Sequence, residues 1–475
     1  MSYLYRQRLI YQAQSEMDSS AADSRVGTLV YSLNGLLITC VFLLIGSLGF
    51  NLNQQVVGTL LPKQLDDLGA SNVIIALLIT ALPSCITMVC NPIFSTWSDR
   101  TRTGLGRRRP FLLFSAPLIA VCMVVIGWTP VWSRELMALS WFQHSWFPLL
   151  FLGIASVCYN ILFMFPMAIL WYLFPDVVPA KYLTRYMAAF NIVAQGSGVL
   201  FGSWLIGFAD GSIGWLYTGA ALFFMVSMSL LVWGVREGDY PPVENRRMTK
   251  TPWGAIRLYL LECYSIPFYY CFFLAMALSD VSQICRWMFN LLYAQKKLGI
   301  SLEDYGSIMS YSAMIGLVCC VPFAWLSDRL HPMRFFIISL LVITSANAVG
   351  FFYVDDERSF LVISIVLAVV YAMQTVCTIP VFVAILPAAN YGQFSSANAL
   401  FRSIFFALGG LGGGMLFDYV GDYQYIYAWD FCFTFAAFGC FLLLYRNWKR
   451  RGGPGHYQAP VYQWKHASTD VPPTA

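Results

Sequence analysis

Residues 72–129 place a short basic loop between two long apolar runs: NVIIALLITALPSCITMVCNPIFSTWSDRTRTGLGRRRPFLLFSAPLIAVCMVVIGWT. Each run is long enough to cross the hydrocarbon core of a bilayer as a helix, which takes about 20 residues. The loop between them carries five arginines within residues 100–109. Arginines close to a membrane span are typical of the cytoplasmic side. The stretch therefore predicts a transmembrane hairpin whose connecting loop lies in the cytoplasm.

The composition of the whole chain agrees with this local pattern. Of its 475 residues, 58% are hydrophobic and only 11% are charged. A soluble domain has about 45–50% apolar and about 25% charged residues, so one soluble core cannot hide this much apolar surface. The composition argues against a soluble enzyme, a disordered scaffold and a nucleic-acid binder, and it predicts an integral, multi-pass membrane protein.

Apolar runs of similar length recur along the chain and predict an all-α membrane protein with twelve transmembrane helices in two pseudosymmetric six-helix bundles. The predicted helices are 30–60, 72–97, 110–129, 146–173, 186–209, 213–234, 264–292, 304–327, 334–353, 359–386, 396–417 and 424–445. The expected division is a cytoplasmic tail (1–29), a first bundle (30–235), a cytoplasmic linker (236–262), a second bundle (263–446) and a cytoplasmic tail (447–475).

Positive charge sets the expected orientation. With both termini in the cytoplasm, the inner segments hold 23 of the 29 Lys and Arg residues. The outer segments then hold 5, and Arg286 falls within a span. This bias predicts that both termini are cytoplasmic.

A short internal sequence repeat indicates that the two halves of the chain are related. The second predicted helix ends in Trp97-Ser98-Asp99-Arg100, and the eighth ends in Trp325-Leu326-Ser327-Asp328-Arg329. Parallel repeats around a central site are a common plan of secondary transporters.

The loop that begins at Ser98 and Asp99 resembles the signature loop of the major facilitator superfamily. Its ending, from Gly106 to Phe111, is similar to that of the glycoside–pentoside–hexuronide:cation symporters and the sucrose–proton symporters. The resemblance implies that Asp99 contacts the start of the eleventh helix, expected near Ser395 and Ser396, and favours the outward-facing state. Asp328 would make the matching contact near the fifth helix. The candidate gating residues are Asp99, Arg100, Gly106, Arg107, Arg108, Arg109, Asp328 and Arg329. The alternative is that the arginines only anchor the topology.

The same resemblance implies that helices one, four, seven and ten line a central cavity. Polar residues at membrane depth are costly and tend to face such a cavity. The candidate substrate-binding residues are Asn51, Gln54, Gln55, Tyr159, Asn160, Asn191, Gln195, Gln283, Trp287, Gln374 and Asn398. Asn347, in the ninth helix, has no place in this scheme. The alternative for each amide is a hydrogen bond between helices.

Uphill transport would need a coupling ion, because the chain has no Walker-type phosphate-binding motif. Of its 24 Asp and Glu residues, only Asp280 lies well within a predicted span. Asp280 is therefore the candidate proton-coupling residue, with Arg286 and Arg402 as the available cations. A structural ion pair between helices seven and eleven is the alternative. Sodium coupling of the melibiose type is disfavoured, because helices two and four carry no acid before their cytoplasmic ends.

These observations predict a secondary active transporter that moves a sugar or glycoside by rocker-switch alternating access, with proton-coupled symport. Amides, hydroxyls and nearby aromatic rings suit a neutral polyhydroxylated substrate. The alternatives are a carrier of an amphipathic lipid or other metabolite, and a non-transporting sensor with a transporter fold. We expect no enzymatic activity, no cofactor other than a coupling proton, no metal site, no nucleic-acid partner and a monomer in the lipid bilayer.

Overall fold

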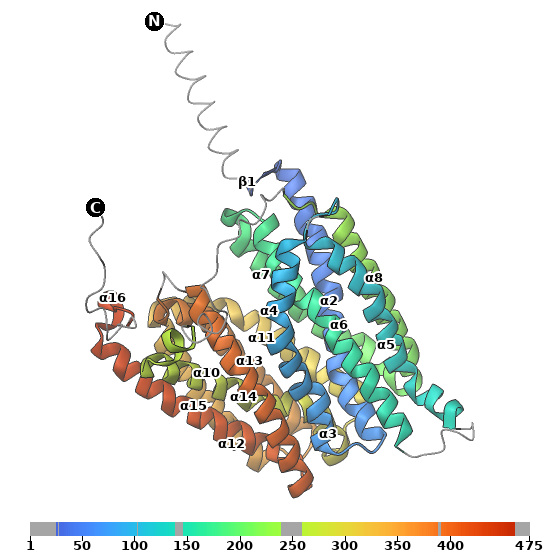
Figure 1. Cartoon of the computed structure of the whole chain (residues 1–475). Helices are drawn as coiled ribbons and strands as arrows, with labels where there is room; N and C mark the ends of the chain where they lie inside the picture. The colour runs from blue at the N-terminus through green and yellow to red at the C-terminus, as the bar shows by residue number, and fades with distance from the viewer. Residues whose placement is uncertain are drawn as a thin grey trace, which may run out of the picture.

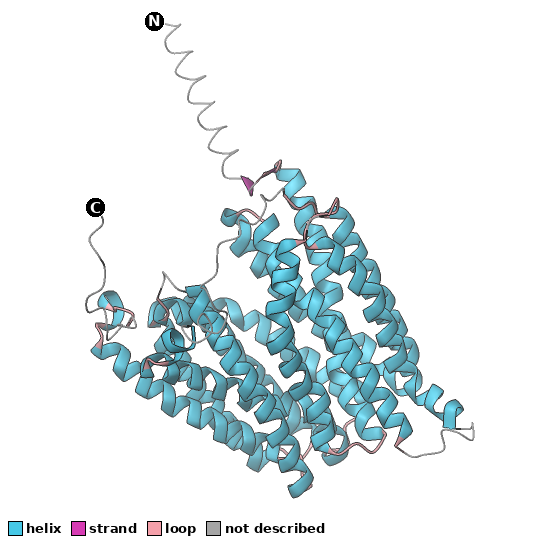
Figure 2. Cartoon of the chain, in the orientation of Figure 1, coloured by secondary structure: helices cyan, strands magenta, loops and turns pink. Residues whose placement is uncertain are grey.

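The computed structural model describes residues 25–26, 28–101, 103–137, 146–238, 259–387 and 391–460. Within these ranges the chain is helical apart from loops and a small hairpin (Figure 2). The hairpin pairs β1 (Arg25–Val26) with β2 (Leu29–Val30). The prediction of an all-helical membrane protein is confirmed. In the part of the chain that the structure describes, eleven helical stretches are long and apolar enough to span a membrane, and one of them, Lys181–Gly234, covers two predicted helices.

The first half of the described chain holds seven α-helices and three short irregular helical segments. These are α2 (Leu33–Asp67), α3 (Asn72–Ala76), the π-helical η1 (Leu77–Ala81), α4 (Leu82–Arg100), α5 (Arg109–Met137), α6 (Phe147–Val177), α7 (Ala180–Leu200), the π-helical η2 (Phe201–Leu205), the 3-10 helix η3 (Ile206–Phe208) and α8 (Ala209–Gly234).

The second half follows the same plan. Its elements are α10 (Pro267–Leu292), the π-helical η4 (Tyr293–Lys297), α11 (Leu302–Leu330), α12 (Pro332–Tyr353), α13 (Glu357–Ile385), α14 (Tyr391–Val420), α15 (Tyr425–Arg450) and the short α16 (Gly453–His456).

The helices form two bundles that lie side by side (Figure 1). In the first bundle, α5 packs on α8 and α6, and α2 packs on α8 and α7. In the second, α10 packs on α15 and α14, and α13 packs on α11 and α12. Because lipid replaces water outside these bundles, close packing and internal hydrogen bonds hold them together.

The two bundles meet most closely at the end near α3, and β1 and α16 lie at the opposite end (Figure 1). At this meeting point small residues bring backbones together. A Cβ on Gly202 would lie 2.6 Å from the carbonyl oxygen of Gly306, and one on Gly414 would lie 2.6 Å from that of Asn72. We call this region the far end, since it lies away from the terminal segments.

The eleventh helix begins earlier than predicted. α14 starts at Tyr391, so Ser395 and Ser396 lie inside the helix and not at its N-cap. The expected start was wrong because hydropathy detects only the apolar part of a helix, whereas this first turn is polar. In this turn the Gln393 side chain donates a hydrogen bond to the Glu262 carboxylate over 2.7 Å, so its amide has a partner.

Candidate functional site

A cavity of about 680 Å³ lies between the two bundles, within the range of small-molecule sites. Six elements contribute to its wall: α2, η1, α4 and α6 from the first bundle, and α10 and α14 from the second. The lining residues are Gln54, Val57, Gly58, Leu61, Ile79, Thr80, Pro83, Ser84, Thr87, Tyr159, Asn160, Phe163, Met167, Asp280, Gln283, Ile284, Trp287, Ala399, Arg402, Ser403 and Phe406.

Five of the predicted substrate-binding residues line this cavity: Gln54, Tyr159, Asn160, Gln283 and Trp287. Two of them are held by further side chains. The Tyr159 hydroxyl donates to the Asn53 side chain over 2.6 Å, and Gln283 Nε2 donates to the Gln374 side chain over 3.3 Å. The half-exposed Trp287 ring reaches across to α2, where it lies against Gly58. The cavity thus has a flat aromatic surface beside several amides.

The other predicted substrate-binding residues are not among the lining residues: Asn51, Gln55, Asn191, Gln195, Gln374 and Asn398. Two of them donate hydrogen bonds to neighbouring polar groups instead. Asn51 Nδ2 donates to the Ser47 carbonyl over 2.7 Å, and Gln374 Nε2 donates to the Ser279 hydroxyl. The bond from Gln374 to Ser279 joins two helices, which was the alternative reading for these amides, whereas the bond from Asn51 to Ser47 stays within α2.

Sequence reasoning missed a row of hydroxyls in the cavity. Thr80, Ser84 and Thr87 line it from η1 and α4, which belong to the second predicted helix and not to the four helices expected to line the cavity. Their spacing of i, i+4 and i+7 puts them on one helical face. This polar stripe in an apolar span is a signal that could have revealed them.

One ion pair crosses the cavity wall. Arg402 on α14 pairs with Asp280 on α10, and both side chains keep some exposure, 40% and 24%. Among the lining residues that the structure describes, these two are the only charged ones. Of the two cations that the sequence offered to Asp280, the structure places Arg402 beside it.

Arg286 belongs to a different network. It turns toward Asp430 on α15, with Nη2 at 3.0 Å from the carboxylate, and Nη2 also donates to the Asn347 side chain over 2.6 Å. Asp430 is fully buried and accepts a further hydrogen bond of 2.6 Å from the Tyr371 hydroxyl. Arg286 is thus not a partner of Asp280. Asn347, for which the sequence suggested no role, accepts a hydrogen bond from the Arg286 guanidinium. The network joins α10, α12, α13 and α15.

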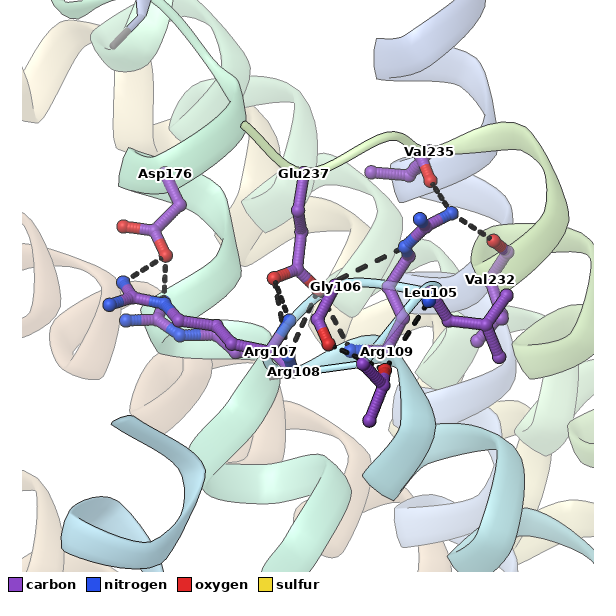
Figure 3. A network of polar contacts seen from close by, with 10 residues as sticks. Leu105, Gly106, Arg107, Arg108, Arg109, Asp176, Val232, Val235 and Glu237 are labelled. Carbon is purple, nitrogen blue, oxygen red and sulfur yellow. Dashed lines mark hydrogen bonds and ion pairs between the residues drawn. The ribbon is translucent and has the colours of Figure 1, made fainter. Parts of the chain in front are cut away.

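The arginine loop forms a compact cradle for one carboxylate (Figure 3). Glu237, just after α8, is fully buried and accepts hydrogen bonds of 2.8–3.2 Å from the backbone N–H groups of Arg107, Arg108 and Arg109. Gly106 makes room for it: its φ is 110°, and a Cβ there would lie 2.8 Å from the Glu237 carboxyl carbon. Consecutive N–H groups at the start of α5 make a site for an anion.

The arginine side chains extend the cradle to neighbouring helices (Figure 3). Arg107 and Arg108 pair with Asp176 at the end of α6, over 2.6 and 2.8 Å. Arg109 Nη1 donates to the carbonyls of Val232 and Val235 at the end of α8, over 3.0 and 2.6 Å. The loop therefore ties α5, α6 and α8 of one bundle together.

Among the remaining candidate gating residues, the structure describes the side-chain contacts of Arg329 alone. The Arg329 guanidinium lies 3.8 Å from the centre of the Trp325 ring on its own helix. The side chains of Asp99, Arg100 and Asp328 lie outside the described part of the structure, and so their expected contacts stay predictions.

At the far end, a carboxylate joins the two bundles. Asp418 near the end of α14 accepts hydrogen bonds from the backbone N–H groups of Asn72 and Val73, over 2.7 and 3.0 Å, and from Asn72 Nδ2 over 2.9 Å. It thereby caps the N-terminus of α3 from across the interface. The Tyr423 hydroxyl donates to the Asn72 side chain over 2.9 Å.

Two lysines of η4 add to these contacts at the far end. Lys296 pairs with Asp66 across the interface over 2.5 Å, and Lys297 pairs with Asp422 over 2.7 Å within its own half. In the described ranges, no group of three or more His, Cys, Asp or Glu side chains is placed to hold a metal ion.

Comparisons with known proteins identify the fold. Residues 272–472 match the family model described as Major Facilitator Superfamily. No curated protein matches the chain in sequence.

Solved structures match over most of the chain. A bacterial homolog to the human lysosomal transporter Spinster, in an inward-facing and occupied conformation, has a TM-score of 0.64 and 15% identity, and the match covers 87% of this chain and 97% of that one. The nucleoside transporter NupG matches with a TM-score of 0.60 and 13% identity over 86% and 100%. A D-xylose-proton symporter matches with a TM-score of 0.60 and 15% identity over 85% and 97%.

Proposed function

We propose that the chain is a transporter of the Major Facilitator Superfamily, whose family model matches residues 272–472, and that it carries a neutral, polyhydroxylated molecule such as a sugar or a glycoside. The observation that carries this proposal is the chemistry of the central cavity. Its wall combines neutral amides and hydroxyls with one half-exposed tryptophan and a single ion pair among the described residues.

A neutral cavity favours a neutral substrate, because an unpaired charge at membrane depth is costly. Gln54, Asn160 and Gln283 offer amide donors and acceptors that suit sugar hydroxyls, and Thr80, Ser84 and Thr87 add hydroxyls to the same cavity wall. The Trp287 ring can cover the apolar face of a sugar ring. An organic anion or cation would instead call for an additional counter-charge beside the ion pair.

The Asp280–Arg402 pair supports coupling to a proton. A proton on Asp280 removes its negative charge and frees the Arg402 guanidinium, which can then turn its donors to a substrate hydroxyl. Both side chains keep contact with the cavity, so a proton can reach them from water that fills it. In this scheme proton binding and substrate binding favour each other, as symport requires.

The far-end contacts support alternating access. We take the end with the terminal segments as cytoplasmic, because the cytoplasmic segments would then hold 23 of the 29 Lys and Arg residues. The contacts of Asp418 with α3 then close the extracellular end, and the described conformation faces inward. Breaking these contacts would let the bundles rock apart and expose the cavity to the other side.

An amphipathic lipid or another partly apolar metabolite is the second candidate. The specific observation in its favour is the apolar part of the cavity wall, with Leu61, Ile79, Phe163, Met167 and Phe406. A lipid would lie along these residues with its polar group near the ion pair.

The test is a substrate screen on purified protein, followed by transport in reconstituted vesicles with the internal pH recorded. We expect a sugar or glycoside to bind and its uptake to acidify the vesicle interior. Asp280→Asn should abolish proton-driven accumulation and spare exchange of preloaded substrate, whereas Glu135→Gln, at an exposed site on α5, should change neither. Binding of lipids but of no sugar would overturn the substrate assignment.

A further inference from the structure

A second hollow lies on the outer face of the second bundle, apart from the central cavity. It is a groove of about 500 Å³ between α12 and α13. Its lining residues are Val342, Ser345, Ala346, Val349, Gly350, Tyr353, Val354, Arg358, Ser359, Val362, Ile363 and Val366. None of these residues lines the central cavity.

The groove has an apolar floor and apolar, exposed walls. Ala346 and Ile363 are buried at its floor, whereas Val349 and Val362 are 51% and 61% exposed along its sides. On a transmembrane bundle such side chains face hydrocarbon. The natural occupant of this part of the groove is therefore an aliphatic chain.

The length of the groove fits one leaflet. From Val342 to Tyr353 the helix advances by 11 residues, which is about 16 Å at 1.5 Å per residue. This is about half of a hydrocarbon core of about 30 Å. The groove ends at the loop between α12 and α13, where Phe352 and Tyr353 are exposed. Aromatic rings next to the end of a span are typical of a membrane surface.

The surface end of the groove carries a cation. Arg358 lies in the first turn of α13, lines the groove and has no salt bridge to any residue that the structure describes. A guanidinium offers several N–H donors in a planar fork, which suits the oxygens of a phosphate. Such a group at the surface end, with an aliphatic groove below it, matches a phospholipid.

Three acids next to this arginine select the kind of headgroup. Asp355, Asp356 and Glu357 precede Arg358 directly and are exposed. Hydrogen bonds from the side chain and the backbone of Ser359 hold the pKa of Asp356 below its ordinary value, so this carboxylate stays ionised near neutral pH. The segment thus carries one positive and three negative charges. Because negative charge is in excess, the segment favours a headgroup that carries an ammonium as well as a phosphate.

We propose that this groove is a binding site for a zwitterionic phospholipid. One acyl chain lies between Val349 and Val362, the phosphate contacts Arg358, and the ammonium group lies beside Asp355 and Glu357. The site also reaches the buried ion network of the second bundle, because Ala346 at its floor precedes Asn347, which accepts a hydrogen bond from Arg286. A bound lipid therefore stabilises the packing of α12 on α13.

The test is native mass spectrometry of the purified, full-length protein titrated with phosphatidylcholine, with phosphatidylglycerol of the same chains and, separately, with cholesterol. We expect phosphatidylcholine to bind more tightly than the other two. Val362→Trp should fill the groove and abolish this binding. Val383→Trp is the matched control, because Val383 lies on the same helix, is 64% exposed and does not line the groove.

Charge variants test the headgroup contacts. Arg358→Ala should weaken phosphatidylcholine binding about tenfold, the change expected for one lost charge-assisted hydrogen bond, and Arg358→Lys should restore most of it. The double variant Asp355→Asn, Glu357→Gln should shift the preference toward phosphatidylglycerol. The variants keep the proposal testable even if Val362→Trp does not fold, since Arg358 is exposed at the surface.

Three results would overturn the proposal. They are equal binding of phosphatidylcholine to both tryptophan variants, a preference of the wild type for phosphatidylglycerol or cholesterol, and no effect of Arg358→Ala. None of them bears on the substrate of the central cavity, because the two sites share no residue.

Discussion

Asp418→Asn removes the negative charge that caps α3 and joins the bundles at the far end. Asp418 accepts three hydrogen bonds there, from Asn72 N, Asn72 Nδ2 and Val73 N, over 2.7, 2.9 and 3.0 Å. Asparagine keeps one oxygen as an acceptor but turns an NH₂ group toward an N–H donor. At least one of the three hydrogen bonds is therefore lost together with the charge.

The size of the effect follows from the contacts. A hydrogen bond to a charged group contributes about 1.5–3 kcal/mol, and an anion at a helix N-terminus adds about 0.3–1 kcal/mol. Because Asp418 is exposed, the lower ends of both ranges apply, and the closed far end should lose about 2 kcal/mol. At 1.4 kcal/mol per factor of ten, this raises the open population about 30-fold.

Hydrogen exchange measured by mass spectrometry reads this opening directly, because the amides of α3 and η1 are shielded by the interface. We expect peptides covering Asn72–Ala81 to exchange about 30-fold faster in Asp418→Asn than in the wild type. Asp67→Asn is the matched control, since among the described residues Asp67 pairs with Lys63 alone, four residues earlier on the same helix. Its exchange in α3 should equal that of the wild type.

The result that refutes this reasoning is equal exchange in Asp418→Asn and Asp67→Asn. Faster exchange spread evenly over all helices would also count against it, because it would indicate general destabilisation and not the opening of one interface.

Three further predictions concern the internal networks and the membrane edge. Gly106→Ala should cost about 1–3 kcal/mol of stability, seen as a lower Tm, because its φ is 110° and its Cβ would lie 2.8 Å from the Glu237 carboxyl carbon. Asp430→Asn should cost about 3–5 kcal/mol, read from thermal unfolding, because it leaves the Arg286 guanidinium buried without a counter-charge; an unchanged Tm would contradict this. Burial, and then the charge of Arg334, lower the pKa of His331 from its ordinary value of about 6.5. The protein should therefore lose stability as pH falls through the interval between that value and the lowered one, and His331→Asn, which keeps a capping residue, should remove this dependence in Tm measured from about pH 8 to 5.

The sequence predicted the twelve helices because each is a long apolar run, and a span of about 20 apolar residues has few other stable structures. It did not predict the π-helical segments at Leu77–Ala81, Phe201–Leu205 and Tyr293–Lys297. These short π-helical segments lie where helices pack closely across the interface, as at Gly202. The sequence alone does not show which helices pack together.

The candidate site was predicted in part for a similar reason. Asp280 was identified because an acid at membrane depth is rare, which is a property of the sequence alone. Asp280 pairs with Arg402, and Arg286 pairs with Asp430. Which of these residues pair depends on how the helices are rotated against each other, and the sequence does not show this. Glu237 was missed because its partners are backbone N–H groups, whose convergence depends on the conformation of the loop at Gly106.

The most direct test of the central claim is the internal pH of vesicles that contain the purified protein, recorded while a neutral sugar identified by the binding screen is added outside. Coupled entry of sugar and proton through the cavity predicts acidification with the wild type and none with Asp280→Asn, although the variant still exchanges preloaded sugar. Sugar uptake by the wild type at constant internal pH, or equal acidification with Asp280→Asn, would contradict the claim that the Asp280–Arg402 pair couples transport to a proton.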